Sequence, residues 1–295
     1  MIRMAGYLVG IASAAAVTVF VLGGIPNRKE GDGNLSKIET TGLAAHGVEI
    51  VGPADASFKT LVSEQAQTKG SPNPAALKSS SVFIVNRSRL AIAALNINWE
   101  LSLPDGTKVS HATAYKSGLG VVSDGDSPHL MDYIARNGSR PFSLLDSSNG
   151  ANPGIGTSMG GGGNNKARQL SEAVKVTVSV DGVLFVDGTF VGPDTKDFFG
   201  LLKAEIDARR DLVEDIAQML DGDAEATKRF ELMANAKSHD NQDQSGNNSY
   251  YNMIKETQAS VISARRKRFG DKALLEAVKV ELSKPRMNLR KLQSN

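Results

Sequence analysis

The sequence contains no cysteine and only four histidines among its 295 residues. Without cysteine the chain forms no disulfide bond, no thiolate-bound metal site and no cysteine nucleophile, so its folded part must rely on a hydrophobic core. No two histidines are four residues apart and no HExxH motif is present, so the sequence offers no local zinc site. The four lie far apart in the chain: His46, His111, His129 and His239. We therefore expect neither a metal ion nor a cofactor.

The chain also lacks a strong excess of charge. Its formal net charge is +2, and 40% of the residues are apolar and 22% charged, as is usual for a folded protein. This balance does not favour nucleic acid as a partner. A chain of this length can build one large domain or two ordinary ones, and we expect two.

One segment has no charged residue at all, the run from Met4 to Ile25. As a helix this run would be about 33 Å long, which is enough to cross a hydrocarbon core of about 30 Å. It has no polar face of the kind that a helix on the surface of a soluble domain shows. Residues 1–25 are therefore predicted to be a membrane anchor or a signal peptide, with residues 4–25 in contact with the membrane.

The choice between anchor and signal peptide depends on the small residues inside the run. Cleavage near Ala14 or Ala16 would leave the apolar residues 17–22 exposed on the mature protein, so we favour an uncleaved anchor. A buried helix of a soluble domain is the third interpretation. We expect the rest of the chain to lie outside the cytoplasm, in the periplasm or on the cell surface if the source is bacterial, and to be secreted if the segment is cleaved.

Residues 26–41 are polar and contain glycine, so they are interpreted as a linker. Alternation of apolar and polar residues begins after it and is clearest from Leu95 to Tyr115, where Pro104-Asp105-Gly106 supplies a turn. Lys175–Val180 alternates in the same way, and Asp181-Gly182 and Asp187-Gly188 are expected to interrupt the chain after it. Val48–Val51 and Ser81–Val85 are further candidates for short strands. Trp99 lies on the apolar side of this pattern, which favours packing in the core over stacking on a sugar. Short strands separated by turns, without helices between them, predict an antiparallel β-sandwich over 42–192, of which the immunoglobulin type is one form.

A long irregular region interrupts these strands, from about Gly118 to Arg168. Its glycine-rich part, near 150–166, is predicted to be a flexible loop. The loop contains Ser158 in the pattern GTSMG, which matches the GxSxG motif of serine hydrolases. That chemistry needs the serine on a turn between an apolar strand and a helix, and the neighbouring residues predict neither. A flexible loop is thus the favoured interpretation, and a hydrolase that uses Ser158 or an undetected pair of carboxylates is the alternative.

Helical spacing of apolar residues replaces the alternation over 193–295. Asp194 is predicted to cap the first helix, and Asp221-Gly222-Asp223 to end it. The overall prediction is therefore an α+β protein with an N-terminal membrane segment, a sandwich domain and a C-terminal helical region.

The charges of the helical region divide between its two halves. Residues 194–245 carry 13 Asp and Glu against 7 Lys and Arg, whereas residues 250–295 carry 4 against 11. Two amphipathic stretches of opposite charge are predicted to pack against each other. The apolar residues expected to meet are Phe198, Leu202, Ile206 and Val213 on one side and Leu274, Val278 and Leu282 on the other. One alternative is a basic surface that binds an anionic partner, such as nucleic acid or acidic lipid headgroups, for which the candidates are Arg265, Arg266, Lys267 and Arg268. The other is a solvated helix face.

The stretches LNINWELSLPDG at 95–106 and VKVTVSVDGVLFVDGTFVGPD at 174–194, followed by helices, resemble uncharacterised exported bacterial proteins with a sandwich-type domain and a helical tail. The resemblance implies a fold and no activity. No catalytic constellation is evident in the sequence. We therefore expect a non-enzymatic, membrane-anchored binding or scaffolding protein, with a protein partner or self-association through the C-terminal helices.

Overall fold

The computed structural model describes residues 37–66, 81–117, 133–145, 163–236, 247–283 and 287–292. The chain divides into residues 1–35 and a unit of residues 36–295, and all of the described residues belong to the second. The uncharged run Met4–Ile25 and the motif around Ser158 lie outside the described residues. Among the described helices, none is both long and apolar enough to cross a membrane.

The predicted hairpin is confirmed. It consists of β4 (Ile92–Ser102) and β5 (Lys108–Lys116), which pair antiparallel, with Leu95 opposite Tyr115. The Leu103 backbone pairs with both Gly106 and Thr107 across the turn, and the Asp105 side chain accepts a hydrogen bond from the Thr107 backbone. Trp99 lies in the core as predicted, fully buried, and its indole donates a hydrogen bond to Thr113 Oγ1 at 3.1 Å.

The strand predicted near 175–180 continues further than its sequence suggests. β7 runs from Lys175 to Phe185, straight through Asp181-Gly182, which were expected to form a turn. The register with β4 shifts at this point, so the pair forms a β-bulge. Gly182 is required there, because a Cβ would overlap the ring of Phe190 in β8 (Thr189–Val191).

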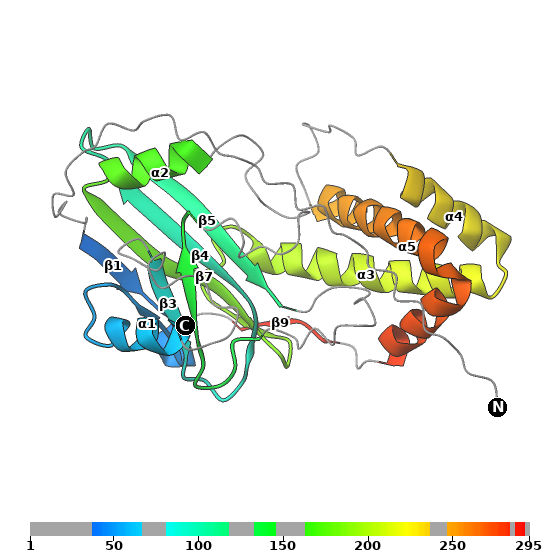
Figure 1. Cartoon of the computed structure of the whole chain (residues 1–295), viewed down its shortest axis with the longest axis horizontal. Helices are drawn as coiled ribbons and strands as arrows, with labels where there is room; N and C mark the ends of the chain where they lie inside the picture. The colour runs from blue at the N-terminus through cyan, green and yellow to red at the C-terminus, as the bar shows by residue number, and fades with distance from the viewer. Residues whose placement is uncertain are drawn as a thin grey trace, which may run out of the picture. The chain divides into compact units, whose positions relative to one another are not determined.

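The predicted antiparallel sandwich is wrong. The larger sheet is mixed, with the order β5-β4-β7-β8-β9, and β1 (Lys37–Thr41) also pairs with β7. β1 runs parallel to β7, and β9 (Arg290–Lys291) runs parallel to β8 (Figure 1). Residues 37–41, placed by sequence in the linker, are thus a sheet strand. Alternation indicates that a segment is a strand, but it contains no information on the direction of a partner distant in the chain.

A second, three-stranded sheet has the order β2-β3-β6, formed by Val48–Val51, Ser81–Asn86 and Ser139–Ser143. The first two were predicted from the sequence, whereas β6 falls in the region expected to be irregular. A short 3-10 helix, η1 (Ala44–His46), precedes β2. Val82 and Ile84 share one core cluster with residues of the larger sheet, and the other side of β3 packs through Phe83 against Phe58 of α1 (Phe58–Ala66).

The glycine-rich region ends in a helix, contrary to expectation. α2 runs from Gly163 to Glu172, so the last residues of the predicted loop are helical. Gln169 of α2 contacts His111 of β5, with 3.0 Å between Gln169 Oε1 and the imidazole Nε2. Leu170 packs on the main core cluster, which places α2 against the hairpin.

Three helices follow the sheets: α3 (Phe198–Leu220), α4 (Ala224–Asn235) and α5 (Asn247–Ser283). The first begins later than predicted, because its N-cap is Asp197 rather than Asp194. Asp194 instead accepts hydrogen bonds from the Phe199 backbone and from Lys291 of β9. Residues 193–295 are therefore not helical throughout, since the chain returns to the larger sheet after α5.

Candidate functional site

The three C-terminal helices, which we call the helical arm, share a core of their own. This cluster includes Val213 of α3, Phe230 of α4, and Leu274 and Val278 of α5. The first turns of α3 belong elsewhere, because Phe198 packs with residues of the larger sheet. The acidic and basic stretches therefore lie against each other, as their charges predicted (Figure 1).

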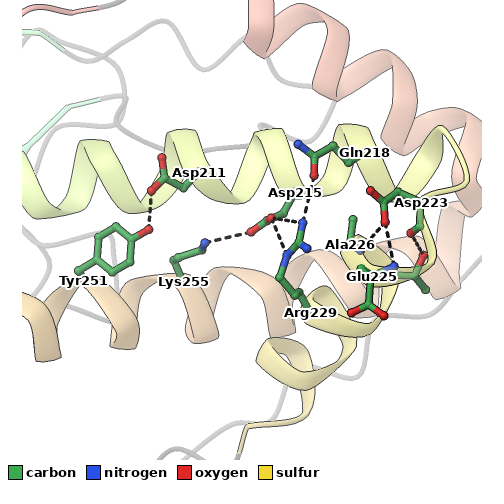
Figure 2. Close-up of polar contacts among 10 residues, drawn as sticks. Asp211, Asp215, Gln218, Asp223, Glu225, Ala226, Arg229, Tyr251 and Lys255 are labelled. Atoms are coloured by element: carbon green, nitrogen blue, oxygen red, sulfur yellow. Dashed lines mark hydrogen bonds and ion pairs between the residues drawn. The ribbon is translucent and has the colours of Figure 1, made fainter.

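Polar contacts follow the line along which α3 meets its neighbours (Figure 2). The Tyr251 hydroxyl donates a hydrogen bond to Asp211 Oδ2 at 2.5 Å, and Lys255 Nζ lies 3.0 Å from Asp215 Oδ2. Arg229 of α4 reaches Asp215 Oδ1 at 3.1 Å, so this carboxylate pairs with both other helices. Burial, with help from the Asp211 carboxylate, raises the pKa of the Tyr251 hydroxyl above its ordinary value. Tyr251 therefore stays protonated and acts as a hydrogen-bond donor.

The turn between α3 and α4 is closed by an N-cap. Asp223 Oδ1 accepts hydrogen bonds from the backbone N–H groups of Glu225 at 2.8 Å and Ala226 at 2.9 Å (Figure 2). These N–H groups have no acceptor within the helix, so the carboxylate satisfies them. The cap thereby sets where α4 begins and how its apolar face meets α3.

Asp223→Ala should therefore lower the free energy of unfolding by about 1 kcal/mol, because two N–H groups lose their acceptor. Chemical denaturation monitored by circular dichroism would measure the change. Asp221→Ala is the matched control, since Asp221 is exposed and, among the described residues, only its backbone forms hydrogen bonds. We expect a change of less than about 0.5 kcal/mol. Equal losses in the two variants would contradict a specific cap.

The sheet and the helical arm meet at a buried cluster of charges, which we call the junction cluster: Lys116 of β5, Glu205 and Arg209 of α3, and Tyr250 of α5. Lys116 Nζ lies 2.5 Å from Glu205 Oε2 and 3.1 Å from the Tyr250 hydroxyl. Arg209 Nη2 lies 2.6 Å from Glu205 Oε1. One fully buried carboxylate thus faces the buried guanidinium of Arg209 and the largely buried side chain of Lys116, and it ties strand β5 to both long helices.

Burial dominates the electrostatics of this cluster. It lowers the pKa of Lys116, although the Glu205 carboxylate acts in the opposite direction, and it lowers the pKa of Arg209 in the same way. Burial and the same carboxylate raise the pKa of the Tyr250 hydroxyl. Arg209 is only partly satisfied, because its contact with Glu205 is an ion pair without hydrogen-bond alignment and its Nε and Nη1 atoms have no hydrogen-bond partner among the described residues. The stability of the cluster therefore depends on Glu205, the carboxylate that pairs with both cations.

A second buried carboxylate holds the approach to α3. Asp181, in the β-bulge, accepts hydrogen bonds from Asn96 Nδ2 at 3.2 Å and from the Thr195 backbone and hydroxyl at 2.9 and 2.7 Å. Its own carbonyl accepts from the Asp194 backbone. Both oxygens of this carboxylate thus accept hydrogen bonds, and these bonds hold the segment that leads from the sheet into α3.

The four predicted basic residues have different surroundings. Arg266 forms two contacts with Asp271, at 2.6 and 3.1 Å, and Arg265 is half-buried and has an interaction of its own. Lys267 and Arg268 are exposed, and the Arg268 guanidinium lies over the ring of Phe269, 4.9 Å from its centroid. Only part of the run is therefore available at the surface.

Of the serine and histidine candidates, the structure describes only His46 and His111. Ser158, His129 and His239 lie outside the described residues, His46 is exposed, and His111 contacts Gln169. Within the described ranges, no group of three His, Asp or Glu side chains is arranged to hold a metal ion.

Sequence interpretation missed the junction cluster, although α3 contained a signal. Glu205 and Arg209 lie three and seven residues after Leu202, on the apolar face of the helix. Charged residues on such a face are buried only when they are paired. The partner Lys116 lies 89 residues away in the chain, so the sequence could not name it.

No family model, no curated protein and no solved structure matches this sequence. The function must therefore be argued from the residues themselves.

Proposed function

We propose that this chain is a binding or scaffolding protein that is attached to a membrane through residues 4–25 and whose body lies on the extracytoplasmic side. In this proposal the sheets form the base, and the helical arm presents its outer surface to a partner or to a second copy of the chain.

The observation that carries the proposal is how the helical arm is held. Its start is braced by Asp181, its side is tied to β5 by Glu205, and its helices are joined through Asp211 and Asp215. Each of these carboxylates serves a contact between elements of the fold. These contacts fix the arm to the sheets, so its outer surface keeps one shape that a partner can bind.

The outer surface of the arm has exposed apolar side chains that could meet a partner. Leu232 of α4 is 66% exposed, and Val261 of α5 is also exposed. Single exposed apolar residues are common on any protein, so they support the proposal only together with the rigid arm and the uncharged N-terminal run.

Membrane attachment is tested by expressing the full chain and a variant without residues 1–25, and extracting the membranes with alkaline carbonate. We expect the full chain to remain with the membranes. The shortened chain should be recovered in the soluble fraction and keep the strand and helix signals of a folded body in its circular dichroism spectrum, because residues 36–295 form a unit separate from residues 1–35. Protease added from outside should degrade the body of the full chain. Recovery of the full chain in the soluble fraction, or protection of its body from external protease, would overturn the proposal.

A further inference from the structure

α5 turns at Gly270, where the backbone is not helical. Gly270 has φ 80° and ψ 171°, so two helices meet there, the first ending at Phe269 and the second beginning at Asp271. The positive φ favours glycine, and a side chain added there would meet no other atom, so the turn projects into open space. We call residues 266–272 the helix corner.

Phe269 is the apolar residue of this corner, and 56% of its surface is exposed. More than half of this aromatic residue thus remains outside the fold, where its apolar area can still be buried by a partner. It lies next to Arg268, whose guanidinium covers part of one ring face. The ring is therefore available to a surface that approaches the corner.

The cations of the corner exceed its carboxylates. Asp271 is the only acidic residue of the helix corner, and both of its oxygens contact Arg266. Lys267 and Lys272 are exposed and have no carboxylate within 4 Å in the part of the chain that the structure describes. Arg268 contacts Phe269 rather than an acid. Three exposed cations thus lie within three residues of Phe269 in the chain, and one of them, Arg268, lies over its ring.

The exposed, described residues of the first helix of α5 carry no negative charge. Its exposed residues before the corner are uncharged: Asn252, Thr257, Ser260, Val261 and Ala264. No carboxylate among them repels an anionic surface. The acidic residue of the stretch, Glu256, is half-buried.

We propose that the helix corner docks on anionic lipid headgroups, with Phe269 entering the interface and Lys267, Arg268 and Lys272 contacting the headgroups. This inference rests on the proposed attachment of the chain through residues 4–25, which brings the chain to a bilayer. Cations beside an inserted aromatic ring are the chemistry by which peripheral segments bind anionic membranes. Each cation contributes about fivefold to the equilibrium between docked and undocked states.

The test uses the full chain with Phe269→Trp, reconstituted into phosphatidylcholine vesicles with brominated acyl chains, with or without phosphatidylglycerol. The only natural tryptophan, Trp99, is fully buried, so the unsubstituted chain supplies the background emission. We expect the introduced indole to be quenched only when phosphatidylglycerol is present, and the quenching to disappear at high salt because salt screens exposed charges.

Two triple variants in the Phe269→Trp background test whether docking depends on the cations of the helix corner or on the total charge of the chain. Lys267→Gln, Arg268→Gln and Lys272→Gln together should shift the docking equilibrium on the order of 100-fold toward the undocked state and abolish the quenching. Lys59→Gln, Lys196→Gln and Lys228→Gln remove the same charge from exposed positions elsewhere and should leave it unchanged.

The outcomes distinguish this inference from the proposed function. A chain that stays with phosphatidylcholine vesicles but shows no quenching in either lipid is attached without the corner, and the inference fails. A chain that does not associate with phosphatidylcholine vesicles contradicts the attachment; if it still shows quenching with phosphatidylglycerol, the corner docks independently. Equal loss of quenching in both charge variants, or an emission shift with nucleic acid and none with anionic lipid, would also overturn lipid docking.

Discussion

Glu205→Gln is expected to lower the free energy of unfolding by about 3–5 kcal/mol. The substitution keeps the shape of the side chain but removes the negative charge that faces Lys116 at 2.5 Å and Arg209 at 2.6 Å. Both cations would then lie side by side without the carboxylate that they share, and burial already disfavours their charged forms. Urea denaturation monitored by circular dichroism would measure the loss.

The matched control is Asp207→Asn, the same chemical change on the same helix. Asp207 pairs with Lys203 at 2.6 Å, but the Lys203 side chain is largely exposed, so the pair contributes less than about 1 kcal/mol. If Glu205→Gln cost no more than this control, the junction cluster would not hold the helical arm to the sheet. Glu205→Gln should also destabilise the helical arm more than the sheet. Amide hydrogen exchange should therefore accelerate more in α3 and α5 than in β4.

Val278→Asp is the second substitution for which we expect a large effect, on the order of 4 kcal/mol. Val278 is 2% exposed and belongs to the same cluster as Val213 and Phe230, so an aspartate there would bury an unpaired carboxylate and lose apolar contacts. Thermal unfolding followed at the helical circular dichroism band would report the change. The cost should diminish below the pKa of a buried carboxyl group, where the side chain is neutral.

Val280→Asp serves as its control. Val280 follows two residues later on α5 and is 58% exposed, so a charge there remains hydrated and should change the stability by less than about 0.5 kcal/mol. Unchanged unfolding of both variants would mean that α5 does not pack against α3, and the arm would then be separate helices rather than one core. A large effect for Val278→Asp alone would support the arm as a single unit.

The interpretation of the helices from the sequence was right in its main point and wrong in several partners. Val213, Leu274 and Val278 do share a core, as their spacing predicted. Phe198 and Leu202, on the same apolar stripe as Val213, pack with the larger sheet instead, and Leu282 is exposed. A helical period identifies the apolar face but not what covers each turn of it, and one long helix can serve two cores.

The strands show the same limit. The hairpin β4–β5 could be predicted because both strands and their turn lie within 25 residues, so alternation and turn chemistry together define the register. The turn expected at Asp181-Gly182 is a bulge. The Asp181 carboxylate accepts hydrogen bonds from Asn96 and Thr195, and these bonds stabilise a strand that continues. The same two residue types do form a turn at Asp187-Gly188, where Gly188 has a positive φ.

The sequence by itself determined the features that depend on neighbours in the chain: the uncharged run Met4–Ile25, the β4–β5 hairpin, and an acidic helix followed by a basic one. Only the tertiary structure decided the parallel strands β1 and β9 and the pairing of Glu205 with Lys116. Periodicity arises from local backbone geometry, whereas these pairings join residues about 90 or more positions apart, and each is favoured only because the rest of the fold brings the partners together and removes water from between them.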